Sequence, residues 1–302
     1  MSEPSEEIAN PPPVPNYSFY LKTKPFDTLK LAIEHLLDPN FNNDGFGMVG
    51  AASDSLAISV NDNDNATATL LLKSSGTIEF QSTAPPSRMG AMLAPLRLIS
   101  QGFPRYLDDR DDDFVVIYHL KGTDRLQLEF GTYPRTGIWA TIVENPRVTM
   151  FPNLTVLSAI TVPVDDIRAM NDYILRAQDR TVFVDWKDDF ATFQIGSREK
   201  WKYEVKEATR LKQGQSIKAW LSWSYYTRLM RGASFLADKV RVYFLSVPEQ
   251  HVLFQFRIGE SADLFLLQKA CLVITDGDMS AEAGARDEDV SDSVTYNTLS
   301  IF

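Results

Sequence analysis

The side chains that could do chemistry are few in this sequence. The densest acidic run is Asp108–Asp113, where carboxylates surround a single arginine, and such a run could hold a divalent cation. Adjacent carboxylates on one loop are more typical of a solvated turn, because two-metal nucleases draw their ligands from separate elements. The run therefore favours a loop between a helix and a strand, and a metal-dependent nucleic-acid enzyme is the alternative from another functional class.

The other candidate nucleophiles and metal ligands form no catalytic pattern. The three histidines, His35, His119 and His251, lack the i, i+4 spacing that places two ligands on one helix face. The single cysteine, Cys271, excludes an intrachain disulfide and a thiolate zinc site, and its apolar neighbours predict a buried strand. The sequence contains no phosphate-binding glycine loop and no nucleophile elbow. We therefore expect a protein that is not an enzyme and needs no metal or cofactor.

A repeated segment indicates how the chain is organised. Residues 23–37 align without a gap with residues 161–175, and each copy predicts a strand that ends at proline, an aspartate N-cap and a helix. Residues 115–120 and 240–245 match in the same order, and each predicts the first strand of a hairpin. A common helix start and similar short strands could also match by chance.

Each half thus predicts a strand, a helix, several strands, a second helix and several more strands. The second helices are expected over residues 91–102 and 221–235. Two tandem copies of one α+β domain, with helices on one face of antiparallel sheets, account for this order.

Composition shifts predict the boundaries of these domains. A proline-rich start predicts a disordered arm, prolines near the middle predict an extended connector, and an acidic stretch predicts a solvated tail. The predicted boundaries are 1–16 for the arm, 17–144 for the first domain, 145–155 for the connector, 156–276 for the second domain and 277–302 for the tail. The tail includes an apolar peptide, residues 294–302, which is either a frayed end or a docking peptide.

Charge limits what the molecule can bind. The formal net charge is −10, so contact with nucleic acid requires a local concentration of cations. Lys30 and Arg168 occupy equivalent positions of the repeat, and Arg97 and Arg228 lie on the two second helices, which contain no acidic residue. A face shared by the helices could therefore be cationic, although basic residues on amphipathic helices are also typical of a solvated face.

Membrane and export signals do not occur in the sequence. No segment has the roughly 20 consecutive apolar residues of a membrane helix. The first residues also lack the basic and apolar regions of a signal peptide. We therefore expect an intracellular protein without a membrane partner.

The second half resembles part of a known family. Residues 224–228, a loop and the hairpin over 240–258 resemble the last helix and hairpin of the proliferating-cell-nuclear-antigen clamps. Residues 262–269, ADLFLLQK, are similar to the final strand of that family, and an acidic tail follows there too. The resemblance spans about residues 17–276 and is carried by element order and residue class. An insertion near residues 198–215 departs from the pattern, which suggests a divergent viral or protist member.

This resemblance implies a sliding clamp, a DNA polymerase processivity factor that encircles duplex DNA. Members form closed rings, usually homotrimers, whose helices line the hole with cations that contact phosphates without reading bases. The implied partners are double-stranded DNA, a DNA polymerase and other proteins of replication and DNA repair that carry clamp-binding peptides, a clamp loader and further copies of the chain. The implied location is the nucleus or a viral replication compartment. The residues implied in DNA binding are Lys22, Lys30, Arg97, Arg105, Arg168, Arg228 and Arg231.

The resemblance also implies a partner-binding pocket beside the connector. Family partners insert a short peptide with apolar anchors there. By match, the pocket residues are Met150, Phe151, Pro152, His251 and Leu267. A subunit of a heterotrimeric checkpoint clamp, or a monomeric or dimeric viral processivity factor, is the alternative within the same fold. The net negative charge argues against a factor that holds DNA by charge alone.

Overall fold

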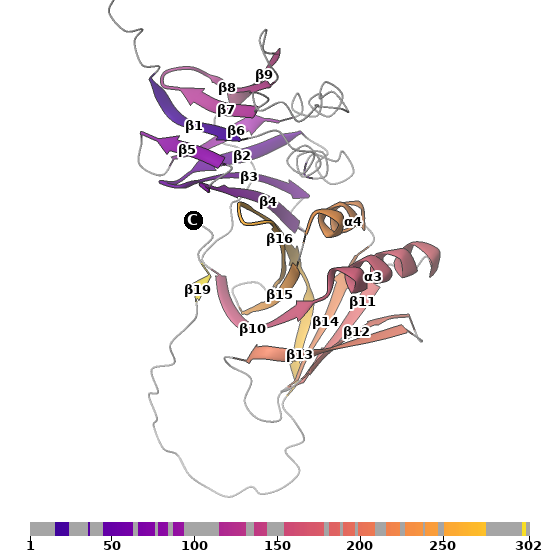
Figure 1. Cartoon of the computed structure of the whole chain (residues 1–302). Helices are drawn as coiled ribbons and strands as arrows, with labels where there is room; N and C mark the ends of the chain where they lie inside the picture. The colour runs from indigo at the N-terminus through magenta and orange to yellow at the C-terminus, as the bar shows by residue number, and fades with distance from the viewer. Residues whose placement is uncertain are drawn as a thin grey trace, which may run out of the picture.

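The computed structural model describes residues 16–23, 36, 45–62, 66–75, 78–83, 87–93, 115–130, 136–143, 154–177, 181–187, 190–196, 199–208, 216–223, 227–237, 239–246, 251–275 and 298–299. Within these ranges the chain is mostly antiparallel strand, with two helices in the second half (Figure 1). Neither of these helices is long and apolar enough to cross a bilayer.

Strands alone make up the described elements of the first half. They are β1 (Tyr17–Thr23), β2 (Phe46–Ala51), β3 (Ser55–Asp62), β4 (Ala66–Lys73), β5 (Ile78–Ser82), β6 (Ser87–Met92), β7 (Val115–Leu120), β8 (Arg125–Phe130) and β9 (Thr136–Val143). Burial alternates along β1 and β5, whereas β3 and β4 are buried at most positions, as strands covered on both faces are. In β1, for example, Phe19 and Leu21 are fully buried, and Tyr20 and Lys22 are only half-buried.

The second half contains the two described helices. Its elements are β10 (Leu154–Val162), α3 (Val164–Ala177), β11 (Thr181–Trp186), β12 (Phe190–Ile195), β13 (Glu199–Ala208), β14 (Ser216–Ser222), α4 (Thr227–Leu236), β15 (Lys239–Ser246), β16 (His251–Ile258), β17 (Ala262–Lys269), β18 (Cys271–Thr275) and β19 (Thr298–Leu299). Cys271 therefore lies in a strand, as predicted.

The two halves repeat one pattern of strand pairing. In the first half, β1 lies between β5 and β7, β2 between β3 and β6, and β8 between β7 and β9. In the second half, β10 lies between β13 and β15, β11 between β12 and β14, and β16 between β15 and β17. The long strand β13 corresponds to both β4 and β5, because its first residues pair with β12 and its last with β10. This repetition supports a duplicated chain.

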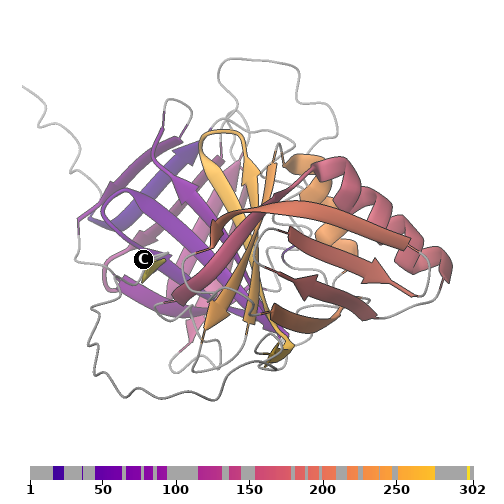
Figure 2. The same ribbon diagram turned by 90° about the horizontal axis from the view of Figure 1, so that it is seen from below.

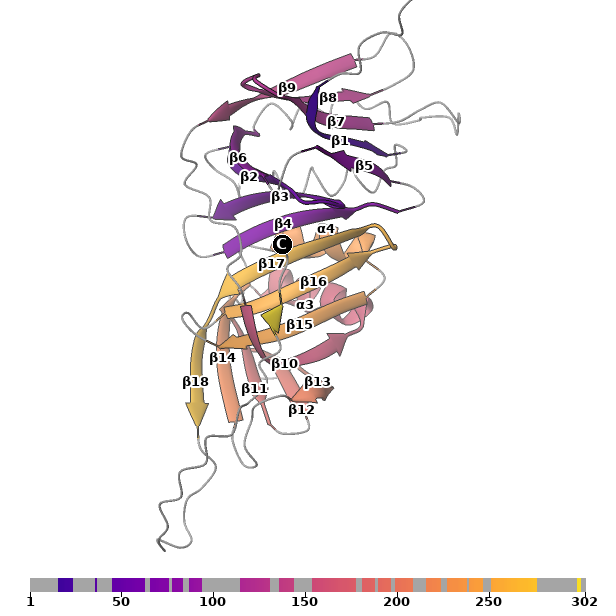
Figure 3. The same cartoon turned by 90° about the vertical axis from the view of Figure 1, so that its left-hand side faces the viewer.

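One sheet continues from the first half into the second. Residues 262–268 of β17 pair antiparallel with residues 66–72 of β4. Figure 3 shows the resulting order, with β3, β4, β17, β16 and β15 side by side. Seen from below, the yellow strands of this sheet lie between the purple first half and the two helices (Figure 2). The halves are thus joined through the backbone.

Aromatic side chains pack β11 and the end of β14 against this sheet. Trp186 meets Phe244 edge to face, with ring centroids 4.1 Å apart, and Trp223 meets Phe254 at 5.4 Å. All four rings are at most 1% exposed. The indole Nε1 of Trp223 donates to Oδ1 of Asn171 on α3 at 2.5 Å. A buried indole N–H needs such an acceptor, so this bond fixes α3 over the strand that Trp223 follows.

Helix α3 begins directly after Pro163. The amides of Asp166 and Ile167 donate to the carbonyl oxygen of Pro163 at 3.1 and 3.3 Å. Asp165 and Asp166 therefore lie inside the first turn, where carboxylates complement the positive end of the helix dipole, and the predicted aspartate N-cap is wrong. The buried face of α3 consists of Ile167, Met170 and Ile174, at helical spacing.

The predicted second helices begin too early. Ala91 belongs to β6, which pairs with β2, and Leu221 belongs to β14, which pairs with β11. In β14 apolar side chains on one face are buried and their neighbours are exposed, and strands on both sides fix this period of two. Helix α4 starts only at Thr227, and residues 94–102 lie outside the described residues. Of the first predicted helix, Leu36 alone is described, as a fully buried helical residue.

Candidate functional site

Arg168 links the two described helices. Its Nη1 donates to Oδ1 of Asp165 at 2.9 Å, and its Nη2 donates to the carbonyl oxygen of Ser234, in the last turn of α4, at 2.7 Å. Its guanidinium carbon lies 5.0 Å from the centroid of the Phe235 ring. The last carbonyls of a helix have no intrahelical donor, so a cation there satisfies an acceptor and offsets the negative end of the dipole. Arg168 therefore holds α3 against α4.

The solvent side of α3 and α4 carries cationic, acidic and aromatic side chains. Arg176 and Arg231 are exposed, and so is Asp172. Phe235 is 61% exposed, and both Arg168 and Arg231 lie within 6.0 Å of its ring centroid. The charges of the described side chains on α3 and α4 balance, because Arg168, Arg176 and Arg231 are matched by Asp165, Asp166 and Asp172. This face can contact phosphates through Arg176 and Arg231.

Lys22 lies elsewhere in the molecule. It belongs to β1 in the first half, on the strand face opposite to the buried Phe19 and Leu21. Its register partner in β5 is Glu79. Figure 1 shows β1 far from α3 and α4. The described structure therefore does not bring Lys22 to the helix face.

Of the residues implied in DNA binding, the structure brings Arg168 and Arg231 together. Arg228 is the second residue of α4, and only its backbone is described. The remaining three, Lys30, Arg97 and Arg105, lie outside the described residues. The DNA contacts of all these residues stay predictions, and the helix link of Arg168 is a role that sequence reasoning did not find.

Replacing Arg168 by lysine separates the helix link from a phosphate contact. Lysine keeps the charge, but its ammonium cannot hold Asp165, the Ser234 carbonyl and the Phe235 ring in one planar fork. We expect Arg168→Lys to lower the free energy of unfolding by about 1–2 kcal/mol in urea denaturation. DNA binding through phosphates should change little, since it needs only charge. The matched control is Arg231→Lys, at an exposed side chain, and equal stability of the two variants would contradict the link.

Two residues implied in partner binding lie on one sheet face. His251 of β16 pairs with Leu245 of β15 and Lys269 of β17, and the next pair on the same face is Leu253 with Leu267. Leu267 is buried, and His251 is half-buried. This face of the sheet formed by β3, β4, β17, β16, β15 and β10 is opposite to the helices, and it is termed the outer face. The other implied residues, Met150, Phe151 and Pro152, lie outside the described residues.

An apolar cluster covers much of the outer face. Its members are Ala57, Leu71, Val156, Ala159, Tyr243, Leu245, Leu253, Phe265 and Leu267, separate from the core under the helices. Sequence reasoning found only Leu267 of this set. The signal was present in the apolar runs Val252–Phe254 of β16 and Leu264–Leu267 of β17, as expected of strands buried on both faces.

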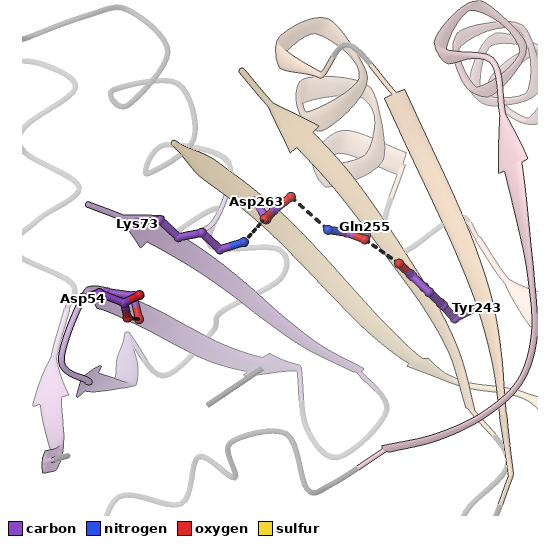
Figure 4. Close-up of polar contacts among 6 residues, drawn as sticks. Asp54, Lys73, Tyr243, Gln255 and Asp263 are labelled. Carbon is purple, nitrogen blue, oxygen red and sulfur yellow. Dashed lines mark hydrogen bonds and ion pairs between the residues drawn. The ribbon is translucent and has the colours of Figure 1, made fainter. Parts of the chain in front are cut away.

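A chain of hydrogen bonds crosses the boundary between the halves on the outer face. Nζ of Lys73, on β4, lies 2.8 Å from Oδ2 of Asp263, on β17. Gln255 donates Nε2 to Oδ1 of Asp263 at 2.9 Å and accepts from the hydroxyl of Tyr243 at 2.7 Å (Figure 4). Asp263 is 1% exposed, so its charge depends on these two donors.

A cavity of about 480 Å³ opens beside this chain of bonds. Its charged lining consists of Lys73, Lys239, Arg241, Arg257 and Asp54. Asp54 stands apart from the hydrogen-bond chain in Figure 4. Lys73 is offset by Asp263, but three further cations against one lining carboxylate make this end of the outer face attractive to anions.

The described residues show no arrangement typical of catalysis. Groups of three or more potential metal ligands do not occur among them, and the Asp108–Asp113 run lies outside them. Burial, together with a hydrogen bond to Asp166 Oδ2 at 2.9 Å, raises the pKa of the Tyr203 phenol. Tyr203 therefore stays protonated and ties β13 to α3.

Comparison with known proteins places this geometry among the clamps. The sequence matches neither a protein-family model nor a curated protein. Among solved structures, the proliferating cellular nuclear antigen from Entamoeba histolytica is similar, with a TM-score of 0.60 and 17% identity over 84% of this chain and 99% of that chain. The chain has a sliding-clamp fold. The resemblance found in the sequence is thus confirmed for the fold.

Proposed function

We propose that this chain is a sliding clamp that encircles duplex DNA and tethers a DNA polymerase and other replication or repair factors to it. The observation that carries the proposal is the fold likeness to a clamp over 99% of that clamp's chain. The arginines on α3 and α4 support a DNA-facing side, and the apolar cluster on the outer face supports a partner-facing side. The proposed protein is not an enzyme and works in the nucleus or in a viral replication compartment.

Open strand edges support assembly into a ring. Residues 199–204 of β13 pair with β12, and residues 136–141 of β9 pair with β8, but neither stretch has a second neighbour among the described strands. In the repeated pairing pattern these edges correspond to β4 and β17, which pair with each other within the chain. We infer that β9 of one chain pairs with β13 of the next in the same way.

Such a contact is head-to-tail, because it joins two different surfaces. A head-to-tail contact closes into a ring when its rotation divides a full turn, and closure leaves no open edge for unspecific pairing. We propose three chains per ring. The two halves of each chain would then supply matching units around the hole.

The mass of the purified protein and its dependence on DNA ends test the proposal. We expect light scattering to give about three times 34.1 kDa. A ring should thread onto immobilised linear duplex with a free end and fail to bind when that end is blocked beforehand. Binding that ignores the block would contradict encirclement and favour a factor held by charge. A single-chain mass would favour a heterotrimeric checkpoint clamp or a monomeric viral factor.

A further inference from the structure

One of the two edges of β10 is shared by two strands. Among the described strands, the other edge pairs with β15 alone, along residues 155–162. On the shared edge, β13 pairs with residues 158–160, and β19 pairs with Leu154 and Thr155. Figure 1 shows β19 beside the first part of β10. The short strand β19 therefore occupies the part of the edge that β13 leaves uncovered.

The structure explains why this part of the edge is available. β13 ends at Ala208, which lies opposite Ser158, and its register with β10 is already irregular between Ala159 and Ile160. Among the described residues, no part of β13 pairs with Leu154 or Thr155. Uncovered backbone N–H and C=O groups on a strand edge are a template for an added strand.

Apolar groups adjoin the uncovered edge. Val156 follows directly in β10, and its partner in β15 is Leu245. Both belong to the apolar cluster of the outer face, where they are 8% and 1% exposed. The sequence around β19 is itself apolar, with Leu299, Ile301 and Phe302 close together. An extended segment can therefore combine backbone hydrogen bonds with apolar contacts here.

We propose that the edge of β10 at residues 154–155 is a strand-addition site for extended apolar peptides, and that β19 (Thr298–Leu299) of this chain is its resident, exchangeable occupant. Only two residue pairs join β19 to β10, so the contact is small. Residues 276–297 connect β18 to β19 and keep the peptide close to its site. A partner peptide must therefore displace this segment, and the proposal holds for a single chain whether or not rings form on DNA.

Binding of the free peptide tests the proposal. A labelled peptide of residues 294–302 is titrated with the full chain and with a variant that lacks these residues, and fluorescence anisotropy reports binding. A tether of this kind gives an effective concentration of about 1 mM, so for a dissociation constant of about 0.1 mM the full chain should bind the peptide about tenfold more weakly. Equal binding to both proteins, or to neither, would overturn the proposal.

A substitution within β19 provides a second variant. Leu299→Lys in the full chain should weaken the resident segment and restore peptide binding to the level of the shortened variant. A peptide of the same composition in scrambled order is the control for unspecific apolar binding. Binding should persist in about 0.5 M salt, where charge attraction is screened. If salt abolishes it, the peptide occupies the cationic cavity and the assignment to the β10 edge is wrong.

Discussion

A proline at the open edge of β13 should leave single chains in solution where the unmodified protein forms rings. Proline has no backbone N–H and its ring needs space, so it cannot sit within a paired ladder. Successive residues of an antiparallel strand direct their amides to opposite sides. Of positions 200 and 201, one therefore faces β12 and the other faces the open edge. The two variants to compare are Lys200→Pro and Trp201→Pro. The one whose amide faces the open edge should keep its unfolding temperature while its mass by light scattering falls to 34.1 kDa.

The expected effect is large because the contact is a single strand pair. A proline removes a ladder hydrogen bond and leaves its acceptor unpaired, which costs about 1–3 kcal/mol and weakens each contact between chains about ten- to a hundredfold. Trp201 also packs edge to face on Tyr173, with centroids 6.4 Å apart, so Trp201→Ala is needed to correct for the lost ring. Lys200 is exposed and needs no such correction. If both proline variants keep the mass of the ring, the chains do not join through β13.

Local pattern was sufficient to predict several elements from the sequence. The hairpin over residues 240–258 was predicted, because β-branched and aromatic residues alternate around a turn, and β15 and β16 confirm it. The closing strand, residues 262–269, has the predicted bounds. Helix α3 was predicted from apolar residues at helical spacing after Pro163. For the hairpin and for α3, neighbouring residues in the sequence carried the whole signal, whereas the closing strand was implied by the family resemblance.

Contacts between distant residues could not be predicted in this way. The family resemblance implied a DNA contact for Arg168, whereas its bond to the Ser234 carbonyl depends on how α3 and α4 pack. The pairing of β4 with β17 joins residues almost 200 positions apart, and no local pattern encodes it. The segment around Leu221 fits both a helical and a strand period, and only its neighbours β11 and β18 decide for strand.

Removing Lys73 should destabilise the junction between the halves. Lys73→Met leaves the buried carboxylate of Asp263 with Gln255 as its remaining side-chain donor among the described residues. Breaking a buried pair in this way costs about 3–5 kcal/mol, and because the Lys73 side chain is 42% exposed we expect about 2–3 kcal/mol in urea denaturation. The matched control is Lys187→Met, because Lys187 is 72% exposed and its partner Asp185, 29% exposed, lies 3.8 Å away, and this change should cost less than about 1 kcal/mol.

The charge of Asp263, rather than the packing of Lys73, should cause this loss. Asp263→Asn keeps an acceptor for Gln255 but removes the charge, so Lys73→Met should cost little in that background. The unmodified protein, the two single variants and the double variant form a double-mutant cycle, in which we expect a coupling free energy of about 2 kcal/mol between Lys73 and Asp263. Hydrogen exchange adds a local measurement, since the amides of β17 facing β4 should exchange faster in Lys73→Met than in the double variant. Additive free energies would mean that the aliphatic stem of Lys73, not its ion pair, holds β4 against β17.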